Sequence, residues 1–555
     1  MRPDTMIRLT IGILLCANSF GVKAQSGNET PRLPGVAGGD LPAIIKTDSG
    51  GYRLLVDGKP FIALGAQLWN SSDWPYILDK EWPQLEELHA NTLEAPVYWQ
   101  NTEPQPGKYN FSEIDTLVLG ARRHGLRLVL LWFGSYKNGS SQYAPEWVLA
   151  HPEKYPRMHN ANGEELTVLS AVAKSNCEAD KAVFAAMMRH LGQIDGRQHT
   201  VILVQVENES GSLGTDRDYS GEANAVFKKG VPSILLQKLG KPAGTWEEVF
   251  GEQAAETFNA WYIASYVEEV ALAGQKEYPL PMYTNVWLRE HGFRRPGEYP
   301  SGGPVSTMLP VWKLAAPALA FISPDIYHSN FTVFSDLCAK YALPGNPFFV
   351  PELGKGIDFA RFEFYALGSY DALGVAVYGI DPFHADPGDE RDKEKLDDKF
   401  SGMADNYRLL RGSIGKIAEL QGTGRLRAVG EEYGRYEQLV TLGGYDILFS
   451  FGYPAYRKKT LTGRALIGQL GEDEFLITGF DTRFQFRPRY GSGYASAEYL
   501  VIEEGYYENG QWIRKRIWNG DEAYHSTLTP DGTTLRIRLR KTKKTNTGPV
   551  KANFE

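Results

Sequence analysis

The chain has 555 residues, of which 42% are hydrophobic and 23% are charged, and its formal charge is −8. This composition is ordinary for a soluble globular protein, and the length suits one large domain with one or two smaller ones. Because the mild acidity provides no basic surface field, we expect no nucleic-acid partner.

Residues 1–24 have the pattern of an export signal. Arg2 and Arg8 form the positive part, LTIGILLCANSF is the apolar part, and VKA before Gln25 is a small-x-small cleavage site. The apolar part is too short to be a permanent membrane span. We therefore expect a protein that is exported to the periplasm or secreted, with no membrane span.

The segment after the signal, residues 25–42, is rich in Gly, Pro, Ser and Asn and predicts a linker. Two cysteines remain beyond it, Cys177 and Cys338, and the sequence leaves open whether they pair. So few cysteines mean that core packing, not a set of disulfides, holds the fold together.

A hairpin signal and eight short apolar runs follow the linker. Asp57-Gly58 stands between two apolar segments, which is typical of a β-hairpin. The runs end in polar or aromatic residues and cover 61–70, 91–99, 127–136, 201–209, 281–288, 321–328, 347–354 and 374–381. Apolar residues at helical spacing lie between them, at 79–90, 112–125, 178–194, 252–274 and 361–374. We therefore predict an α/β fold, an elaborated (β/α)8 TIM barrel with an N-terminal hairpin, over residues 43–420.

An open doubly wound sheet is the alternative fold, but no Gly-rich phosphate loop follows any run. Long loops at 137–176, 210–250 and 289–318 would wall a pocket above the C-terminal ends of the barrel strands. Beyond residue 420, apolar and polar residues alternate between turn residues. This pattern predicts a C-terminal antiparallel β domain, sandwich-like, over 421–545, either a structural appendage or a sugar-binding module.

The fourth run, VILVQVENE, ends in two carboxylates although its body is apolar. Strand residues alternate faces, so Gln205, Glu207 and Glu209 are predicted to share the barrel interior, with Val204 and Val206 toward the helices. Glu209 would then lie at the rim, one layer above Glu207. A buried ion-pair cluster is the alternative, yet this run holds no Lys or Arg to pair with the carboxylates.

A second strand-end carboxylate stands in the seventh run, NPFFVPELG, whose one charge is Glu352. The same alternation places Phe348, Val350 and Glu352 on one inward face. Glu209 and Glu352 would then face each other across the pocket. Such a pair suits glycoside hydrolysis, in which one acid protonates the leaving oxygen while the other carboxylate attacks the anomeric carbon.

These motifs resemble those of clan A glycoside hydrolases, in which Asn-Glu ends strand 4 and a lone Glu ends strand 7. VQVENE and the segment APVYWQNTEPQPGKYNFSEID are similar to family 35, the β-galactosidases. The resemblance spans roughly residues 52–385. The loop WFGSYKNGSSQYAPEW and the stretch PELGKG depart from the animal and plant enzymes, and the chain looks like the shorter bacterial branch, whose members include enzymes acting on xyloglucan side chains.

The resemblance implies a retaining, exo-acting β-galactosidase that uses no cofactor. It assigns Glu209 as the general acid/base, Glu352 as the nucleophile and Asn208 as the donor to the sugar 2-hydroxyl. Because strict alternation turns Asn208 outward, the strand must end or bulge there. Glu209 should have a raised pKa, while Glu352 should stay ionised.

Further substrate contacts are predicted at strand ends, with ordinary loop or core packing as the alternative for each. These candidates are Lys137, Asn138, Tyr327, Gln67, Asn70 and Trp99. Tyr327 is also the candidate hydrogen-bond donor to Glu352, and Glu207 is expected to be either a second polar contact or a support for its neighbours. His328 and His384 lack the spacing of a metal site, so no catalytic metal is expected.

Two kinds of alternative function remain open from the sequence. Another clan A activity, on β-arabinopyranosides or β-glucosides, would use the same carboxylate pair with different hydroxyl contacts. A non-catalytic glycan-binding protein on a barrel scaffold is the other alternative. Binding alone does not require two strand-end glutamates, which favours an enzyme.

Overall fold

The computed structural model describes residues 41–380, 396–451 and 460–543. The expected export signal, most of the expected linker and His384 lie outside these residues. Within them, no helix is long and apolar enough to cross a membrane. Cys177 and Cys338 are both buried and unpaired.

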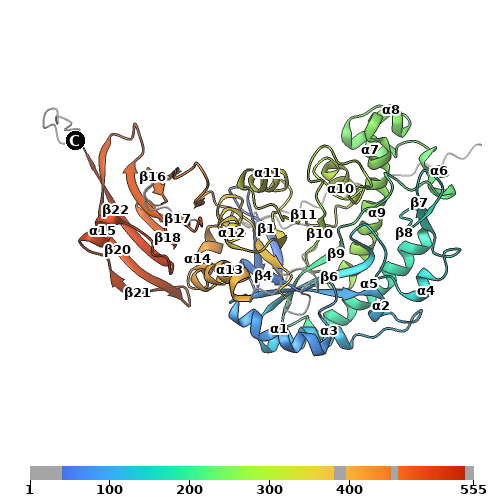
Figure 1. The fold of residues 1–555 in the computed structure, drawn as a ribbon, viewed down its shortest axis with the longest axis horizontal. Helices are drawn as coiled ribbons and strands as arrows, with labels where there is room; N and C mark the ends of the chain where they lie inside the picture. The colour runs from blue at the N-terminus through green and yellow to red at the C-terminus, as the bar shows by residue number, and fades with distance from the viewer. Residues whose placement is uncertain (1–40, 381–395, 452–459, 544–555) are drawn as a thin grey trace, which may run out of the picture.

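A closed barrel of eight parallel strands forms the centre of the molecule (Figure 1). The strands are β4 (Ala63–Gln67), β5 (Thr92–Tyr98), β6 (Arg127–Lys137), β9 (Val201–Asn208), β10 (Met282–Val286), β11 (Phe321–Pro324), β12 (Val350–Leu353) and β13 (Gly374–Tyr378). The sheet runs β11-β10-β9-β6-β5-β4-β13-β12, and a parallel bridge between Ile326 and Leu353 joins its two ends. Each predicted run contains one strand, so the predicted barrel is confirmed.

Helices cover the outside of the barrel because the strands are apolar on that face. They include α1 (Pro75–Glu87), α3 (Ser112–Arg123), α5 (Lys174–Asp195), α9 (Ala254–Glu277), α10 (Leu309–Ala315), α11 (Phe331–Tyr341), α12 (Ile357–Ser369), α13 (Leu396–Arg411) and α14 (Ile414–Leu420). Val204 and Val206 of β9 belong to the same buried core as Val267 of α9. The valines therefore face the helices, as the alternation predicts.

A small antiparallel sheet closes the N-terminal end of the barrel. It consists of β1 (Ala43–Lys46), β2 (Tyr52–Val56) and β3 (Lys59–Phe61). The turn between β2 and β3 is Asp57-Gly58, with φ of 51° and 73°, the left-handed pair that a tight hairpin needs. Leu54 packs with Phe321 and Phe349 in the barrel interior, so this end is filled by side chains and the opposite end carries the polar groups.

The C-terminal region forms two antiparallel sheets packed on each other. One sheet contains β14 (Leu426–Gly430), β17 (Arg464–Gly471), β18 (Glu474–Phe480), β22 (Thr533–Lys543), β20 (Tyr494–Glu508) and β21 (Gln511–Ile517). The other contains β15 (Glu437–Leu442), β16 (Tyr445–Ser450) and β19 (Arg483–Pro488). Ile447 and Phe486 of the smaller sheet share a buried core with Ile467 and Ile477 of the larger one. The predicted antiparallel β domain is confirmed.

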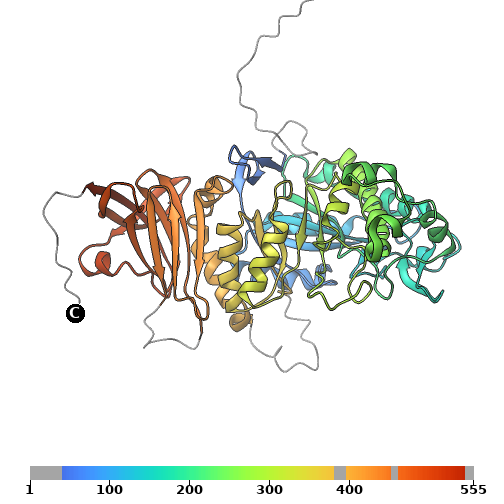
Figure 2. The ribbon, with the colours of Figure 1, turned by 90° about the horizontal axis from the view of Figure 1, so that it is seen from above.

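This domain lies at one end of the molecule, with α12, α13 and α14 between it and the barrel strands (Figures 1 and 2). The approach of α12 to the sheet is close, because a Cβ at Gly368 would meet Leu466 Cδ2 at 2.4 Å and Ala428 Cβ at 2.8 Å. A side chain at this position would push the two units apart. The helix that follows β12 is therefore held directly by the C-terminal domain.

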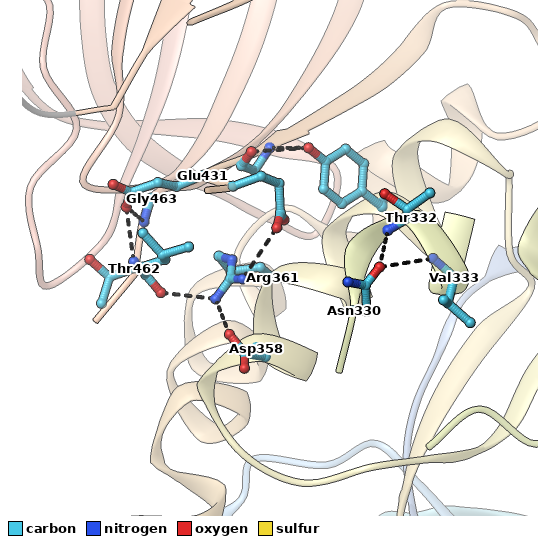
Figure 3. Close-up of polar contacts among 12 residues, drawn as sticks. Asn330, Thr332, Val333, Asp358, Arg361, Glu431, Thr462 and Gly463 are labelled. Carbon is cyan, nitrogen blue, oxygen red and sulfur yellow. Dashed lines mark hydrogen bonds and ion pairs between the residues drawn. The ribbon is translucent and has the colours of Figure 1, made fainter. Parts of the chain in front are cut away.

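Arg361 of α12 is a polar link between the two units (Figure 3). Only 2% of its surface is exposed. Its guanidinium donates to Asp358 Oδ1 at 2.7 Å and to the Leu461 carbonyl at 3.1 Å, and it lies 3.5 Å from Glu432 Oε2. In the same interface the Tyr365 hydroxyl donates to the Gly430 carbonyl at 3.0 Å.

Replacing Arg361 by methionine is expected to lower the free energy of unfolding by about 3–5 kcal/mol. The reason is that Glu432, whose pKa burial raises to about 7, would lose its cationic neighbour. Urea denaturation followed by circular dichroism measures the change. Arg408→Met, which breaks an ion pair to Asp405 on the surface, is the control and should cost no more than about 1 kcal/mol. Equal costs for the two variants would contradict this role of Arg361.

Candidate active site

A cavity of about 320 Å³ opens at the C-terminal ends of the barrel strands. Its wall is made by Lys137, Asn138, Glu209, Trp287, Leu288, Glu290, Asp325, Tyr327, His328, Glu352 and Tyr378. These residues end, or directly follow, β6, β9, β10, β11, β12 and β13. A (β/α)8 barrel carries its reactive groups at this end, and the cavity is therefore the candidate active site.

The end of β9 has an unusual backbone that decides where its polar residues point. Glu207 and Glu209 have φ of 61° and 46°, left-handed values that are uncommon for residues other than glycine. Strained conformations of this kind persist where the surroundings hold them and gather at functional sites. The two left-handed residues flank Asn208, so simple alternation of faces ends here.

The prediction that Glu207 lies beneath Glu209 in the barrel interior is therefore wrong. The Glu207 carboxylate turns toward α5 and accepts the backbone N–H groups of Ser135 at 3.2 Å and Tyr136 at 2.6 Å. Burial, followed by the proximity of Asp180 on α5, raises the pKa of Glu207 well above its usual range. Glu207 thus ties the end of β6 to the end of β9, which is a supporting position.

Asn208 is fully buried next to the cavity wall. Its Oδ1 accepts a hydrogen bond from Lys137 Nζ at 2.9 Å, across the register pair that the two residues form between β9 and β6. The register of this pair slips between Trp132 and Lys137, so the strands do bulge near Asn208. Its Nδ2 has no hydrogen-bond partner among the described residues, which leaves one buried donor unused.

Three donors surround Glu352, which is 5% exposed. Tyr327 donates its hydroxyl to Oε2 at 2.5 Å, Gln67 Nε2 donates to Oε1 at 3.1 Å, and Asn285 Nδ2 lies 3.5 Å from Oε1. Hydrogen bonds to a carboxylate favour its ionised form. These donors hold the Glu352 carboxyl group in a fixed orientation at the cavity wall.

Glu209 is set in a different environment. Its backbone N–H donates to Asn285 Oδ1 at 2.8 Å, which fixes the turn at the end of β9. Burial, followed by repulsion from Glu352, raises the pKa of Glu209 to about 7. Oxygen atoms of Glu209 and Glu352 lie within 4.8 Å of each other. A carboxyl group with a raised pKa thus faces one that is held by three side-chain donors.

Glu352 lines the cavity as predicted, although the residues of β12 before it do not follow the predicted alternation of faces. Phe348 and Val350 pack in the core between the barrel and its helices, whereas Phe349 packs in the barrel interior. The register of β12 against β13 slips between Val350 and Leu353. This irregularity returns Glu352 to the inward face.

Of the six predicted contact residues besides Asn208, three line the cavity, and they are Lys137, Asn138 and Tyr327. The other three do not line it. Trp99 opens α2 (Trp99–Thr102) and is fully buried, with its Nε1 donating to Glu103 Oε2 at 3.1 Å. Gln67 reaches the Glu352 carboxylate and does not line the cavity. Asn70 is absent from the cavity wall as well, and its carbonyl accepts the Tyr143 hydroxyl at 3.2 Å.

Sequence reasoning missed Asn285, Asp325 and Tyr378, which lie in or at the ends of β10, β11 and β13. Asn285 contacts both Glu209 and Glu352, and Asp325 and Tyr378 line the cavity. A signal was present for Asp325. It is the one charged residue of the run FISPDIYH, the same feature that singled out Glu352.

Part of the barrel is similar to a known family. Residues 53–287, which include β4 to β10, match the model of glycosyl hydrolases family 35. The match covers less than half of the chain. The barrel strands from which Glu209 projects are therefore similar to those of family 35 glycoside hydrolases.

Proteins similar to this chain include "Beta-galactosidase-1-like protein 3" of Mus musculus, 27% identical over 215 residues, and "Beta-galactosidase" of Xanthomonas manihotis, 28% identical over 193 residues. The matches cover 38% and 34% of this chain. The chain spans about a third of the length of these relatives, 31% and 30%.

Among solved structures, the β-galactosidase of the psychrophilic Marinomonas ef1 is 13% identical, with a TM-score of 0.46 over 64% of this chain and 61% of that one. Residues 403–529 match a domain of unknown function, DUF5597. That match begins in α13 and extends through most of the C-terminal sheets.

Proposed function

We propose that this protein is an exported, retaining β-galactosidase that removes terminal β-galactosyl residues from oligosaccharides. The observation that carries the proposal is the carboxyl pair, with oxygens of Glu209 and Glu352 within 4.8 Å of each other in opposite environments. Retaining glycosidases separate their carboxyl groups by about 5–5.5 Å, whereas inverting enzymes leave room for a water between them. The match of residues 53–287 to family 35 and the similarity to β-galactosidases support galactose as the sugar.

In the first step Glu352 attacks the anomeric carbon, and the bond from that carbon to the leaving oxygen breaks. Glu209 donates its proton to the leaving oxygen, which departs as an alcohol. The Glu352 ester of the sugar remains. The Tyr327 hydroxyl and the Gln67 amide hold the attacking carboxylate in position before this step.

In the second step Glu209, now ionised, removes a proton from a water molecule, whose oxygen attacks the anomeric carbon. The bond from this carbon to Glu352 breaks, and both carboxyl groups return to their first states. Two inversions at one carbon give net retention. The unused Nδ2 donor of Asn208 and the ammonium group of Lys137 are placed to bind sugar hydroxyls when a substrate fills the cavity.

Exo action is the mode we propose, since a cavity of about 320 Å³ has room for one terminal sugar. The loops after β6 and β10 supply Asn138 and Leu288 to its wall. Xyloglucan-type side chains, which end in galactose, are the natural substrates we propose, on the basis of the resemblance to the shorter bacterial branch of the family.

A panel of aryl β-glycosides tests the proposal. Purified protein should hydrolyse aryl β-galactosides with a kcat/KM at least tenfold above that for β-glucosides and β-arabinopyranosides. Proton NMR at early times should show the β-anomer of free galactose, which means retention. Preference for another sugar would overturn the galactose assignment, α-galactose as first product would overturn retention, and turnover of none of the substrates would favour a glycan-binding protein.

A further inference from the structure

Asp325 is a third buried carboxyl group at the centre of the candidate active site. It directly follows β11, is 4% exposed and lines the cavity. Its Oδ2 accepts Asn285 Nδ2 at 2.9 Å, while its Oδ1 receives no N–H or O–H donor among the described residues. Neither step of the mechanism above uses this side chain.

The Asn285 amide joins Asp325 to the two carboxyl groups of the proposed pair. Asn285 Oδ1 accepts the backbone N–H of Glu209, and Asn285 Nδ2 points between Asp325 and Glu352. One oxygen of each of the three carboxyl groups lies within 4.8 Å of the others. A single side chain thus fixes the spacing of all three acids.

The charge balance of this cluster requires a shared proton. Lys137 is the cation that the cavity places beside Glu209 and Asp325, and three carboxylates around one ammonium group repel one another strongly in a buried site. Glu352 is the best supplied with donors, so the proton belongs to the other two acids. Burial and the two neighbouring carboxylates raise the pKa of Asp325 well above its usual range.

We infer that Asp325 is a positioning residue for the catalytic proton, which it shares with Glu209 through a carboxyl–carboxylate hydrogen bond. The inference rests on the proposed function of Glu209. In the free enzyme one proton lies between the two acids while Glu352 is ionised. When the leaving oxygen takes this proton, Glu352 becomes a neutral ester, so the cluster holds two negative charges before and after the step.

After the second step, the proton taken from water returns to the space between Glu209 and Asp325. The charged and titratable groups that face Asp325 are Glu209, Glu352, Lys137 and the hydroxyls of Tyr283, Tyr327, Tyr341 and Tyr378. Lys137 is the one cation among them and favours the ionised form of the pair. The carboxylate of Glu352 opposes it and keeps the proton in place.

Carbon-13 NMR of protein labelled at Asp and Glu carboxyl carbons tests this sharing in the free enzyme, without substrate. In Asp325→Asn the titration midpoint of Glu209 should fall by about 1 pH unit or more, because a neighbouring negative charge is removed. In Glu209→Gln the midpoint of Asp325 should fall in the same way. Sharing predicts this reciprocal change, whereas a merely structural role of Asp325 does not.

The control is Glu363→Gln, which removes a buried carboxyl group of α12 whose pKa is about 8. It should leave the titration midpoint of Glu209 unmoved.

On an aryl galactoside with a poor leaving group, the kcat/KM of Asp325→Asn relative to that of the unchanged protein should be about tenfold lower at pH 8 than at pH 5. Unchanged midpoints in both carboxyl variants would overturn the inference, even in a protein that hydrolyses galactosides. Lowered midpoints in a protein without galactosidase activity would uphold the shared proton between Asp325 and Glu209 and refute the proposed function.

Discussion

Replacing Glu352 by glutamine is expected to lower kcat on an aryl β-galactoside by at least about 10³-fold. Glutamine matches the shape of glutamate, but its neutral amide cannot form the glycosyl ester through which the proposed mechanism runs. The change leaves the cavity wall in place, so the affinity for galactose should change far less than the rate. Steady-state kinetics and calorimetric titration with galactose measure the two effects separately.

The control for this variant is Glu268→Gln in α9. Glu268 is a partly buried carboxylate that accepts the Ala318 N–H at 2.8 Å, and it does not line the cavity. It should retain kcat within about twofold, because the change is remote from the cavity. Glu352→Gln with a kcat within tenfold of the unchanged protein would show that another group is the nucleophile.

Replacing Glu209 by alanine is expected to have an effect that depends on the leaving group. On a substrate with a poor leaving group, kcat/KM should fall by about 10²–10⁴-fold, the usual contribution of a general acid. On a dinitrophenyl galactoside, whose leaving group departs without a proton, kcat/KM should fall much less. The rate kcat should fall for both substrates, because hydrolysis of the ester then lacks its base.

The pH dependence of kcat/KM is a second test of Glu209→Ala. The pKa of Glu209 is raised to about 7, so its acid form is present below this pH and lost above it. The unchanged protein should therefore lose kcat/KM on the poor-leaving-group substrate as pH rises through about 7. This alkaline decline should be absent in Glu209→Ala. An equal loss of kcat/KM on both substrates, with the decline intact, would mean that Glu209 is not the acid.

The barrel could be predicted from the sequence because its strands are buried on both sides and therefore read as apolar runs. Eight such runs, with apolar residues at helical spacing between them, are compatible with few folds other than a (β/α)8 barrel. The polar residues at the ends of the runs then mark one face, since parallel strands end together. Glu209 and Glu352 were found in this way, as carboxylates where an apolar strand stops.

Alternation within a strand failed where the strand backbone is irregular. Glu207 and Glu209 adopt left-handed conformations, and β12 slips in register before Leu353. Tertiary contacts stabilise both irregularities, through the backbone of Ser135 and Tyr136 in one case and the neighbouring strands in the other. Residue spacing along the chain does not reveal such contacts.

The roles of individual polar side chains were equally hard to predict, because they depend on which strand stands beside which. Gln67 and Glu352 are 285 positions apart in the chain, yet their side chains form a hydrogen bond at 3.1 Å. Trp99 and Lys137 both lie at the end of a barrel strand, since Trp99 directly follows β5 and Lys137 ends β6. The short helix α2 nevertheless places the Trp99 ring in the core. Such placements follow from the closed barrel and its loops.

Trapping of the glycosyl-enzyme tests the central claim most directly. A 2-deoxy-2-fluoro-galactosyl donor with a good leaving group should form the ester but hydrolyse slowly, because fluorine destabilises the positive charge of the second transition state. Mass spectrometry should then show one added fluorogalactosyl unit per chain, located on the peptide that contains Glu352. A label on Glu209 or Asp325, or hydrolysis of the donor without any labelled protein, would contradict the proposed mechanism.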